Sequence, residues 1–395
     1  MNAPVSRTHW RGIGIAFLAG VAAATALSKA SPAALDLRSA LNLSLTQIGW
    51  VMSAGTVATF LLGVASGQLS HWRGARRLLR DGLLVLLVAG CLSALAPATG
   101  WLLAGRGLEG LGVVLITVSA PTLIASLSRR EDLGLAMGVW ALWLPVGSVL
   151  MLALAPALLA ASGWRGLWAV SGLAALAVLA LLRGVPPHAG PASGGRLDLS
   201  VLRSAGPWWL ALAFFCFSSQ FFSIYTFLPA HLAHTVGLGT TAGALASALV
   251  PAAIIPGNLA GGLLIHRGAS PVSVLALPAL PLLVVMPCLL LAPHTPPLTY
   301  LLLAAYGFFL GMMPTGIFTL APRLAPTPPA TGPILGLALS GQGLGILTGP
   351  PLVGMLLEHT GSWLWPVLML AGALLGLVIC ALVLRGSIAS AQRTD

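Results

Sequence analysis

Residues 46–75 read TQIGWVMSAGTVATFLLGVASGQLSHWRGA, and residues 240–269 read TTAGALASALVPAAIIPGNLAGGLLIHRGA. Placed on each other without a gap, the two stretches share eleven identities, among them Thr46/Thr240, Ser53/Ser247 and Arg73/Arg267. Leu, Ala and Gly match by chance in apolar sequence, but polar residues falling in register indicate an internal repeat. Further pairs follow at an offset of roughly 200 residues, such as LLAGRG (102–107) with LLAAYG (302–307). The repeat predicts a chain built from two similar halves.

The composition excludes a soluble protein. Among the 395 residues, 57% are hydrophobic and 7% are charged, whereas a soluble domain carries about a quarter charged residues to face water. The mean hydropathy of +0.97 indicates a membrane protein embedded in a lipid bilayer. Four isolated cysteines, each inside an apolar run, offer neither a disulfide framework nor a metal motif and are expected to be buried.

Twelve apolar segments are long enough to cross a bilayer, which requires about 20 residues each. The longest polar break, residues 184–206, has the Pro/Gly/Ser composition of a flexible linker and separates six segments from six. We therefore expect a helical bundle at 1–183, a cytoplasmic linker at 184–206 and a second bundle at 207–395. The expected spans are 12–31, 47–70, 82–98, 101–126, 134–160, 164–183, 207–231, 241–265, 271–292, 298–321, 332–356 and 363–384.

Basic residues fall unevenly on the two sides of these spans. With the N-terminus in the cytoplasm, 15 of the 19 Lys and Arg residues lie inside, and only Lys29, Arg38 and Arg165 lie outside. The positive-inside rule then places both termini in the cytoplasm and explains the pI near 11.2 without a nucleic-acid partner. A cleavable signal peptide at the N-terminus is the alternative, and cleavage would leave eleven spans.

Two motifs resemble the major facilitator superfamily (MFS). The stretch GQLSHWRGARR (67–77), which contains Gly67, Arg73, Gly74 and Arg77, resembles that superfamily's G-x-L-x-D-R-x-G-R-[RK] loop, but His71 and Trp72 stand where the family has aspartate and arginine. LLAGRGLEGLG (102–112) resembles its fourth-helix pattern. Within the superfamily, GVWALWLPVG (138–147) resembles the fifth helix of the cyanate and nitroimidazole transporter branch.

The resemblance implies an all-α membrane protein whose twelve transmembrane helices form two six-helix bundles related by pseudo-two-fold symmetry. It also implies a monomer in the inner membrane that transports a small molecule by rocking of the two bundles. Because His71 replaces the loop's aspartate, the charge relay on the cytoplasmic side is expected to be weakened or replaced.

Arg106 and Glu109 are the charged residues expected inside a span, where a charge is costly and therefore a functional candidate. They are three apart and share one face of the fourth span. Arg106 would attract an anionic substrate or hold Glu109 ready for protonation; alternatively, the two form a self-neutralising structural pair. In the repeat, Tyr306 occupies the position of Arg106.

Several uncharged residues near mid-span depth are further candidates for a substrate-binding site. Each is equally open to a structural role, because lone polar residues in membrane bundles commonly bond neighbouring helices. They are Thr25, Trp143, Gln220, Tyr225 and Gln342.

Other chemistry has little support in the sequence. Lys29, the single lysine, is expected to extend to the outer surface, and it lacks the glycine-rich run of a nucleotide-binding loop. His71, His231, His234 and His266 are expected in solvated positions, with no third ligand for a metal. We expect no enzyme activity, no cofactor and no metal.

Small residues spaced four apart predict close helix contacts. In the family the helices concerned form the interface between halves, so these positions are expected either to slide or to pack statically. They are Gly63/Gly67, Gly134/Gly138, Gly257/Gly261 and Gly341/Gly345/Gly349.

These features predict a secondary transporter of a small organic anion or weak acid, coupled to protons through Glu109. Efflux of hydrophobic drugs is an alternative that the aromatic seventh span favours. A membrane sensor or scaffold without transport is an alternative of another class.

Overall fold

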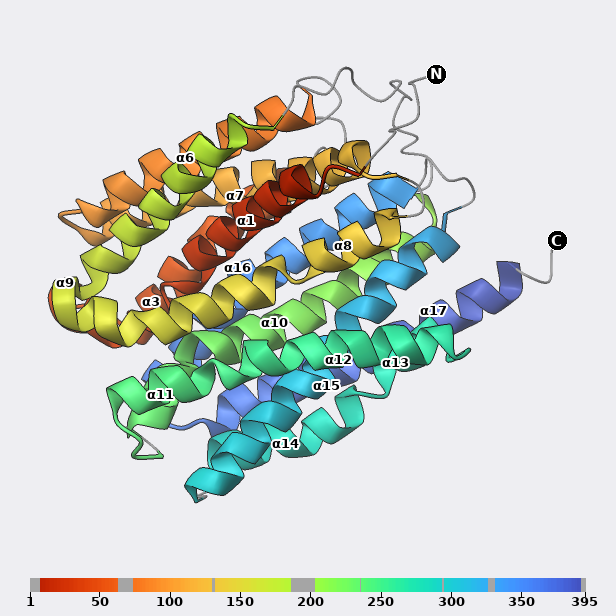
Figure 1. Ribbon diagram of the computed structural model, residues 1–395. Helices are drawn as coiled ribbons and strands as arrows, with labels where there is room; N and C mark the ends of the chain where they lie inside the picture. The colour runs from red at the N-terminus through yellow and green to blue at the C-terminus, as the bar shows by residue number, and fades with distance from the viewer. Residues whose placement is uncertain are drawn as a thin grey trace. The chain divides into compact units, whose positions relative to one another are not determined.

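The computed structural model describes residues 8–62, 74–129, 132–185, 203–234, 236–292, 295–325 and 331–391, which are helical apart from short connections (Figure 1). Nine helical segments in these ranges are long and apolar enough to cross a membrane. The helices are α1 (Trp10–Ser28), α2 (Ala34–Leu41), α3 (Leu45–Ser53), η1 (Ala54–Thr56), α4 (Val57–Leu62), α6 (Ala75–Ala94), α7 (Thr99–Leu127), α8 (Leu133–Ala141), α9 (Trp143–Leu182), α10 (Ala205–His234), α11 (Thr240–Ser247), α12 (Leu249–His266), α13 (Pro271–Ala276), α14 (Ala279–Leu291), α15 (Pro296–Arg323), α16 (Thr331–Thr360) and α17 (Leu364–Ala391).

The helices lie where the sequence predicts spans, and most ends agree within a few residues. Two ends differ by seven residues: α17 ends at Ala391 although the expected span ends at 384, and α6 begins at Ala75 although the expected span begins at 82. Its first two turns contain Arg76, Arg77 and Arg80, so the helix continues beyond its apolar part. Apolar length marks the part of a helix that lies in lipid, and the helix itself is longer.

Gly163 turns the fifth span into the sixth. Helix α9 has 40 residues, about 60 Å of helix at 1.5 Å per residue, which is twice the thickness of a bilayer core. The chain reverses at Gly163, whose φ of 62° and ψ of −168° belong to a region that essentially only glycine occupies. Spans at 134–160 and 164–183 are therefore separated by one residue's backbone conformation.

We expect Gly163→Ala to destabilise the protein by about 1–3 kcal/mol, the usual cost of a strained backbone conformation. No heavy atom lies within 4 Å of the position of an added Cβ, so the cost is purely conformational. Gly100→Ala is the control, because Gly100 has equally open space and an ordinary helical φ. The midpoint of thermal unfolding in detergent measures the stability of both variants. Equal midpoints would contradict the left-handed backbone conformation described for Gly163.

Residue contacts divide the chain into two units. The first comprises Met1–Lys29 and Ala65–Gly195, and the second comprises Ala30–Val64 and Arg196–Asp395. Helix α3, from the second expected span, thus belongs with the later helices and packs against α16. The bundle limits expected from the sequence, 1–183 and 207–395, stay a prediction.

The first unit is built around α1. This helix packs against α7 and α9, and α6 packs against the same two helices. Because α1 is surrounded, most of its residues are buried, and its alanines and isoleucines form the centre of the apolar core with side chains of α6, α7 and α9.

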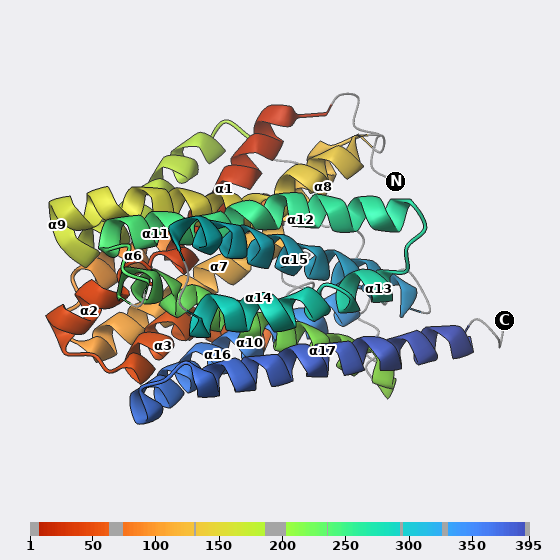
Figure 2. The ribbon, with the colours of Figure 1, turned by 90° about the horizontal axis from the view of Figure 1, so that it is seen from below.

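Glycines bring helices of the second unit into backbone contact, as α12 and α15 show by running side by side (Figure 2). A Cβ on Gly257 of α12 would lie 2.1 Å from the carbonyl oxygen of Phe308. Gly341 and Gly345 of α16 face α10 just as closely. These glycines therefore hold helices of one unit together, as the static-packing interpretation expects, and sliding between the halves stays a prediction. Gly138 faces open space, and the pair Gly63/Gly67 lies outside the described residues.

Helix α16 contains a proline whose missing hydrogen bond is replaced by α3. Pro350 has no N–H, so it leaves the carbonyl of Ile346, four residues earlier, without its helical donor. The Ser53 hydroxyl donates to that carbonyl at 2.7 Å. The two segments approach closely here, since a Cβ on Gly49 would lie 2.6 Å from the Pro350 carbonyl oxygen.

Candidate functional site

Helix α7 places Arg106 and Glu109 side by side in the interior of the first unit. Spaced three residues apart, they share one face of the helix, and both are buried, with 0% and 1% of their surface exposed. Arg106 Nη1 donates to Glu109 Oε2 at 2.5 Å. The pair that the sequence singles out is therefore formed.

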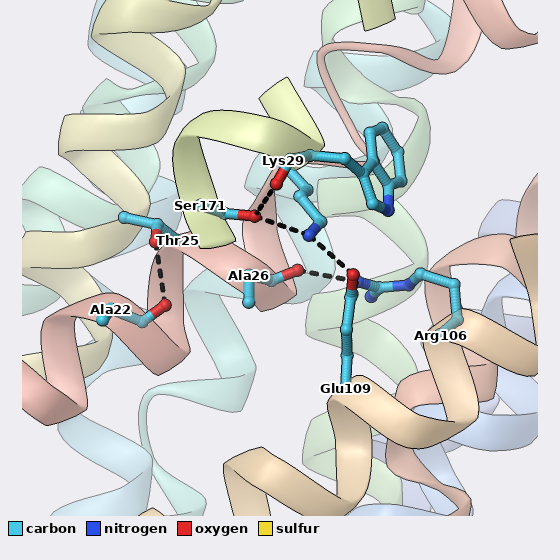
Figure 3. A network of polar contacts seen from close by, with 8 residues as sticks. Ala22, Thr25, Ala26, Lys29, Arg106, Glu109 and Ser171 are labelled. Atoms are coloured by element: carbon cyan, nitrogen blue, oxygen red, sulfur yellow. Dashed lines mark hydrogen bonds and ion pairs between the residues drawn. The ribbon is translucent and has the colours of Figure 1, made fainter. Parts of the chain in front are cut away.

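Arg106 also binds the end of α1. Its Nη1 donates to the carbonyl oxygen of Ala26 at 2.7 Å (Figure 3). Ala26 lies in the last turn of α1, where carbonyls lack a helical partner and carry the negative end of the helix dipole. The guanidinium thus satisfies a carbonyl that would otherwise be unpaired in an apolar core.

Lys29 completes the site, which corrects the expectation that it extends to the outer surface. Its side chain is fully buried, and Nζ donates to Glu109 Oε1 at 2.8 Å and to Ser171 Oγ of α9 at 2.7 Å. Nζ also lies 5.0 Å from the centre of the Trp168 ring. Lys29 is buried because Glu109 is a buried carboxylate that can pair with a second cation besides Arg106, and Lys29 at the end of α1 is within reach.

We call Lys29, Arg106 and Glu109 the charge cluster. Each oxygen of Glu109 accepts from a different cation, Oε1 from Lys29 and Oε2 from Arg106, so the carboxylate is fully engaged. With all three groups ionised, two positive charges face one negative charge. The charge cluster therefore has an excess of positive charge in surroundings that exclude water.

Two further candidates, in the first unit, make their contacts outside the charge cluster. The hydroxyl of Thr25 donates to the carbonyl of Ala22, one turn back in the same helix, at 2.8 Å (Figure 3). Trp143 begins α9 and stacks on Trp140 with ring centres 5.6 Å apart. The fifth span is interrupted at Leu142, before Pro145, so this stacked pair flanks the break.

Gln220 and Tyr306 meet in the interior of the second unit. Both are fully buried, and the amide of Gln220 on α10 donates to Met286 Sδ at 3.8 Å. The Gln220 side chain interacts with the Tyr306 hydroxyl of α15. Neither the Tyr306 hydroxyl nor Gln220 Oε1 completes a well-formed hydrogen bond to another described residue. The Tyr306 hydroxyl and the Gln220 amide thus form a second polar site in an apolar core.

The remaining candidates are packed in different ways. Tyr225 is buried on α10 with its ring 5.5 Å from that of Phe221, and its backbone carbonyl accepts from Ser31 Oγ at 2.5 Å. Gln342 is half-buried on α16.

Comparison with known proteins decides the family. The sequence model of the Major Facilitator Superfamily matches residues 16–332, most of the chain. The chain belongs to the Major Facilitator Superfamily. It is a multi-pass membrane protein of this family of transporters of small molecules, and the expected all-α fold is confirmed.

Solved structures and curated relatives agree with this MFS assignment. The inward-facing, occupied crystal structure of a bacterial homologue of the human lysosomal transporter Spinster superimposes with a TM-score of 0.76 at 16% identity, covering 97% of this chain and 96% of that one. The inner membrane metabolite transport protein YgcS of Escherichia coli (strain K12) is 26% identical, covering 95% of this chain and 91% of its own length.

A shorter part of this MFS protein matches the sequence of a resistance protein. The methylenomycin A resistance protein of Bacillus subtilis (strain 168) is 31% identical over 146 residues, which cover 36% of this chain. The match spans only 31% of that relative's own length.

The MFS loop motif is described only in part. Gly67, His71 and Arg73 lie outside the described residues. Gly74 precedes α6 with a φ of 78°, a conformation that favours glycine, and Arg77 is exposed in the first turn. The neighbouring Arg76 donates to the carbonyl of Leu182 at 3.1 Å, so the start of α6 is bound to the end of α9.

The expected burial of one histidine and two cysteines in this MFS protein is wrong. His231 is not solvated: it is buried, its Nε2 lies 3.3 Å from the Leu289 carbonyl, and Trp363 packs on its ring. Cys91 and Cys288 are exposed on their helices, not buried, because an apolar helix in a membrane also directs small residues toward lipid. No group of three metal-binding side chains occurs among the described residues, and His71 lies outside them.

Proposed function

We propose that this protein is a secondary transporter that moves a small organic anion or weak acid across the inner membrane by alternating access, coupled to protons. The observation that carries the proposal is that two cation-forming side chains, Arg106 and Lys29, share one carboxylate at full burial. When both are protonated, one positive charge lacks a counter-charge, which is costly in a buried site, so a second negative group is favoured there. A substrate anion supplies such a group.

Proton coupling is proposed because the charge cluster contains ionisable groups in the interior. Glu109 is the buried carboxylate among the described residues, and the sequence favours it as the coupling group. The similarity to YgcS, an inner membrane metabolite transport protein, supports the inner-membrane location. The resemblance of residues 138–147 supports the cyanate and nitroimidazole branch. Cytoplasmic termini and a monomeric state belong to the same proposal.

Efflux of a hydrophobic drug is the second candidate function. The methylenomycin A resistance protein of B. subtilis favours it, as does the multidrug transporter mfsC of Aspergillus fumigatus, which is 30% identical over 34% of this chain. The aromatic face of α10 fits an apolar substrate, with Phe214, Phe217 and Phe221 packed in succession.

Substrate flux in proteoliposomes tests the proposal. We expect lactate or cyanate uptake to fall about tenfold or more in Arg106→Gln, because a hydrogen bond to a charged group contributes about 1.5–3 kcal/mol. The remaining Lys29–Glu109 pair is neutral overall, so this variant is expected to fold. Arg165→Gln is the matched control, since Arg165 is exposed and binds only the Ala96 carbonyl and the Trp164 ring in the described structure.

A cationic dye distinguishes the two candidate functions in the same vesicles. Undiminished uptake of both anions in Arg106→Gln would remove the anion proposal. Dye transport by the native chain without anion uptake would favour drug efflux.

A further inference from the structure

Lys29 gives the charge cluster a proton-exchanging group of its own. We infer that Lys29 takes up one proton from water as a monovalent anion binds at the charge cluster and releases that proton when the anion leaves, an inference that rests on the anion transport proposed above. In atoms, the neutral amine and a proton form the ammonium ion, and the reverse step restores both. Anion and proton would then move together with no net charge.

The charge count selects Lys29 among the three groups. Arg106 cannot lose its proton in a protein. Both oxygens of Glu109 act as hydrogen-bond acceptors, Oε1 from Lys29 and Oε2 from Arg106, which is the geometry of a carboxylate. With Arg106 positive and Glu109 negative, a neutral Lys29 makes the empty cluster neutral. Once an anion is bound, a protonated Lys29 makes the cluster and its ligand neutral again.

The hydrogen bonds of Lys29 suit both forms of its amine. Ser171 Oγ donates to the backbone carbonyl of Trp168 at 2.9 Å, so it accepts from Nζ. Glu109 Oε1 and Ser171 Oγ are thus two acceptors for the two N–H groups of a neutral amine. The ammonium form adds a third N–H, and the Trp168 ring face, 5.0 Å from Nζ, stabilises a cation. Neither form requires the side chain to leave its site.

The other elements around Lys29 bring no further charge. Among the described residues, the charges that act on Lys29 are those of Glu109 and Arg106, both on α7. Helix α9 contributes Ser171 and the Trp168 ring, while its Ser148 pairs with Ser28 of α1 at 2.8 Å. In the described part of the chain, the charges that act on Lys29 therefore belong to the charge cluster.

A pH gradient and a membrane potential, applied in separate experiments to proteoliposomes, distinguish proton-coupled from uncoupled anion transport. The probes are radiolabelled lactate and cyanate. For the native chain we expect about tenfold accumulation for an inward gradient of one pH unit, the ratio for one proton per anion, and no response to a clamped membrane potential. In Lys29→Arg the charge is permanent, so the pH-driven ratio should fall to about one. An inside-positive potential of about 59 mV should then drive tenfold accumulation, because the anion crosses alone.

Proton uptake by the purified protein gives a second, independent readout. In weak buffer with a pH dye, saturating lactate or cyanate should cause the native chain to take up about one proton per bound anion. Lys29→Met and Lys29→Arg should take up none, whereas Arg165→Gln should behave like the native chain. Lys29→Met copies the neutral amine in size and leaves Arg106 and Glu109 as a balanced pair, so it is expected to fold.

The outcomes separate this inference from the proposed function. If the native chain transports both probes with protons and the Lys29 variants still take up a proton, the inference fails and anion transport stands. If the native chain transports neither probe, the proposed function fails, and the inference with it. Failure of Lys29→Met to fold would also overturn the inference, because that variant copies its resting state.

Discussion

Replacing Glu109 with Gln is expected to destabilise the protein by about 3–5 kcal/mol, the cost of breaking a buried ion pair from one side. Gln keeps the shape of the side chain, so packing is preserved. What changes is the charge: Arg106 and Lys29 lose their shared counter-charge at a depth where water does not reach them. The measurement is the midpoint of thermal unfolding in detergent, together with the yield of monodisperse protein.

A partly exposed carboxylate provides the control for Glu109→Gln. Asp81 pairs with Arg80 at 2.9 Å, and their side chains are 23% and 56% exposed, so water screens this pair, and exposed pairs contribute about 0–1 kcal/mol. Asp81→Asn should therefore shift the midpoint little. Adding Lys29→Met to Glu109→Gln removes a buried amine that has lost its carboxylate partner and should recover part of the loss, as expected for coupled residues. Equal shifts for Glu109→Gln and Asp81→Asn would show that the charge cluster is not buried as described.

Replacing Gly341 with Ala should give the second large loss, because α16 and α10 touch through their backbones. The added Cβ would lie 2.2 Å from the carbonyl oxygen of Ala211, and the same change at Gly345 would place it 2.4 Å from that of Phe215. Backbone atoms cannot turn aside as a side chain can, so the helices must separate. Overpacking typically costs about 1–3 kcal/mol, and we expect the Gly341/Gly345 double variant to lose more than either single one.

Gly372→Ala is the matched control on α17. No heavy atom lies within 4 Å of its added Cβ, and alanine in a helix is favoured over glycine by about 0.5–1 kcal/mol. This variant should be neutral or slightly stabilised in the same unfolding assay. A Gly341→Ala protein as stable as Gly372→Ala would contradict the close contact between α16 and α10.

Much of the fold was predictable because a membrane imposes local rules. Apolar length gave the spans, and the small residues at 161–163 separate the two spans between which Gly163 reverses the chain. What the sequence could not give is which helices pack together. The glycines of α12 and α16 were recognised by their spacing, but their partners α15 and α10 are set by tertiary structure.

Only the part of the candidate site that lies on α7 was predictable from the sequence. Arg106 and Glu109 share a helix face, so their contact follows from spacing alone. Lys29 lies 80 residues from Glu109 in the chain, and counting it among the outer basic residues hid its role. One signal was available: the single lysine ends an apolar helix while a carboxylate is buried elsewhere. His231 was misplaced for a similar reason, since a residue in the last turn of α10 becomes buried only through α14 and Trp363.

The proline of α16 has a consequence for which states this protein can adopt. The hydrogen bond from Ser53 to the Ile346 carbonyl means that the backbone of α16 is completed by a residue of another segment. Lipid offers no donor in exchange, and an unsatisfied carbonyl in hydrocarbon costs several kcal/mol. Any state in which α3 withdraws from α16 must therefore admit water, or another hydroxyl, to that carbonyl. Hydration at Ile346 is thus a local marker for the parting of these two segments.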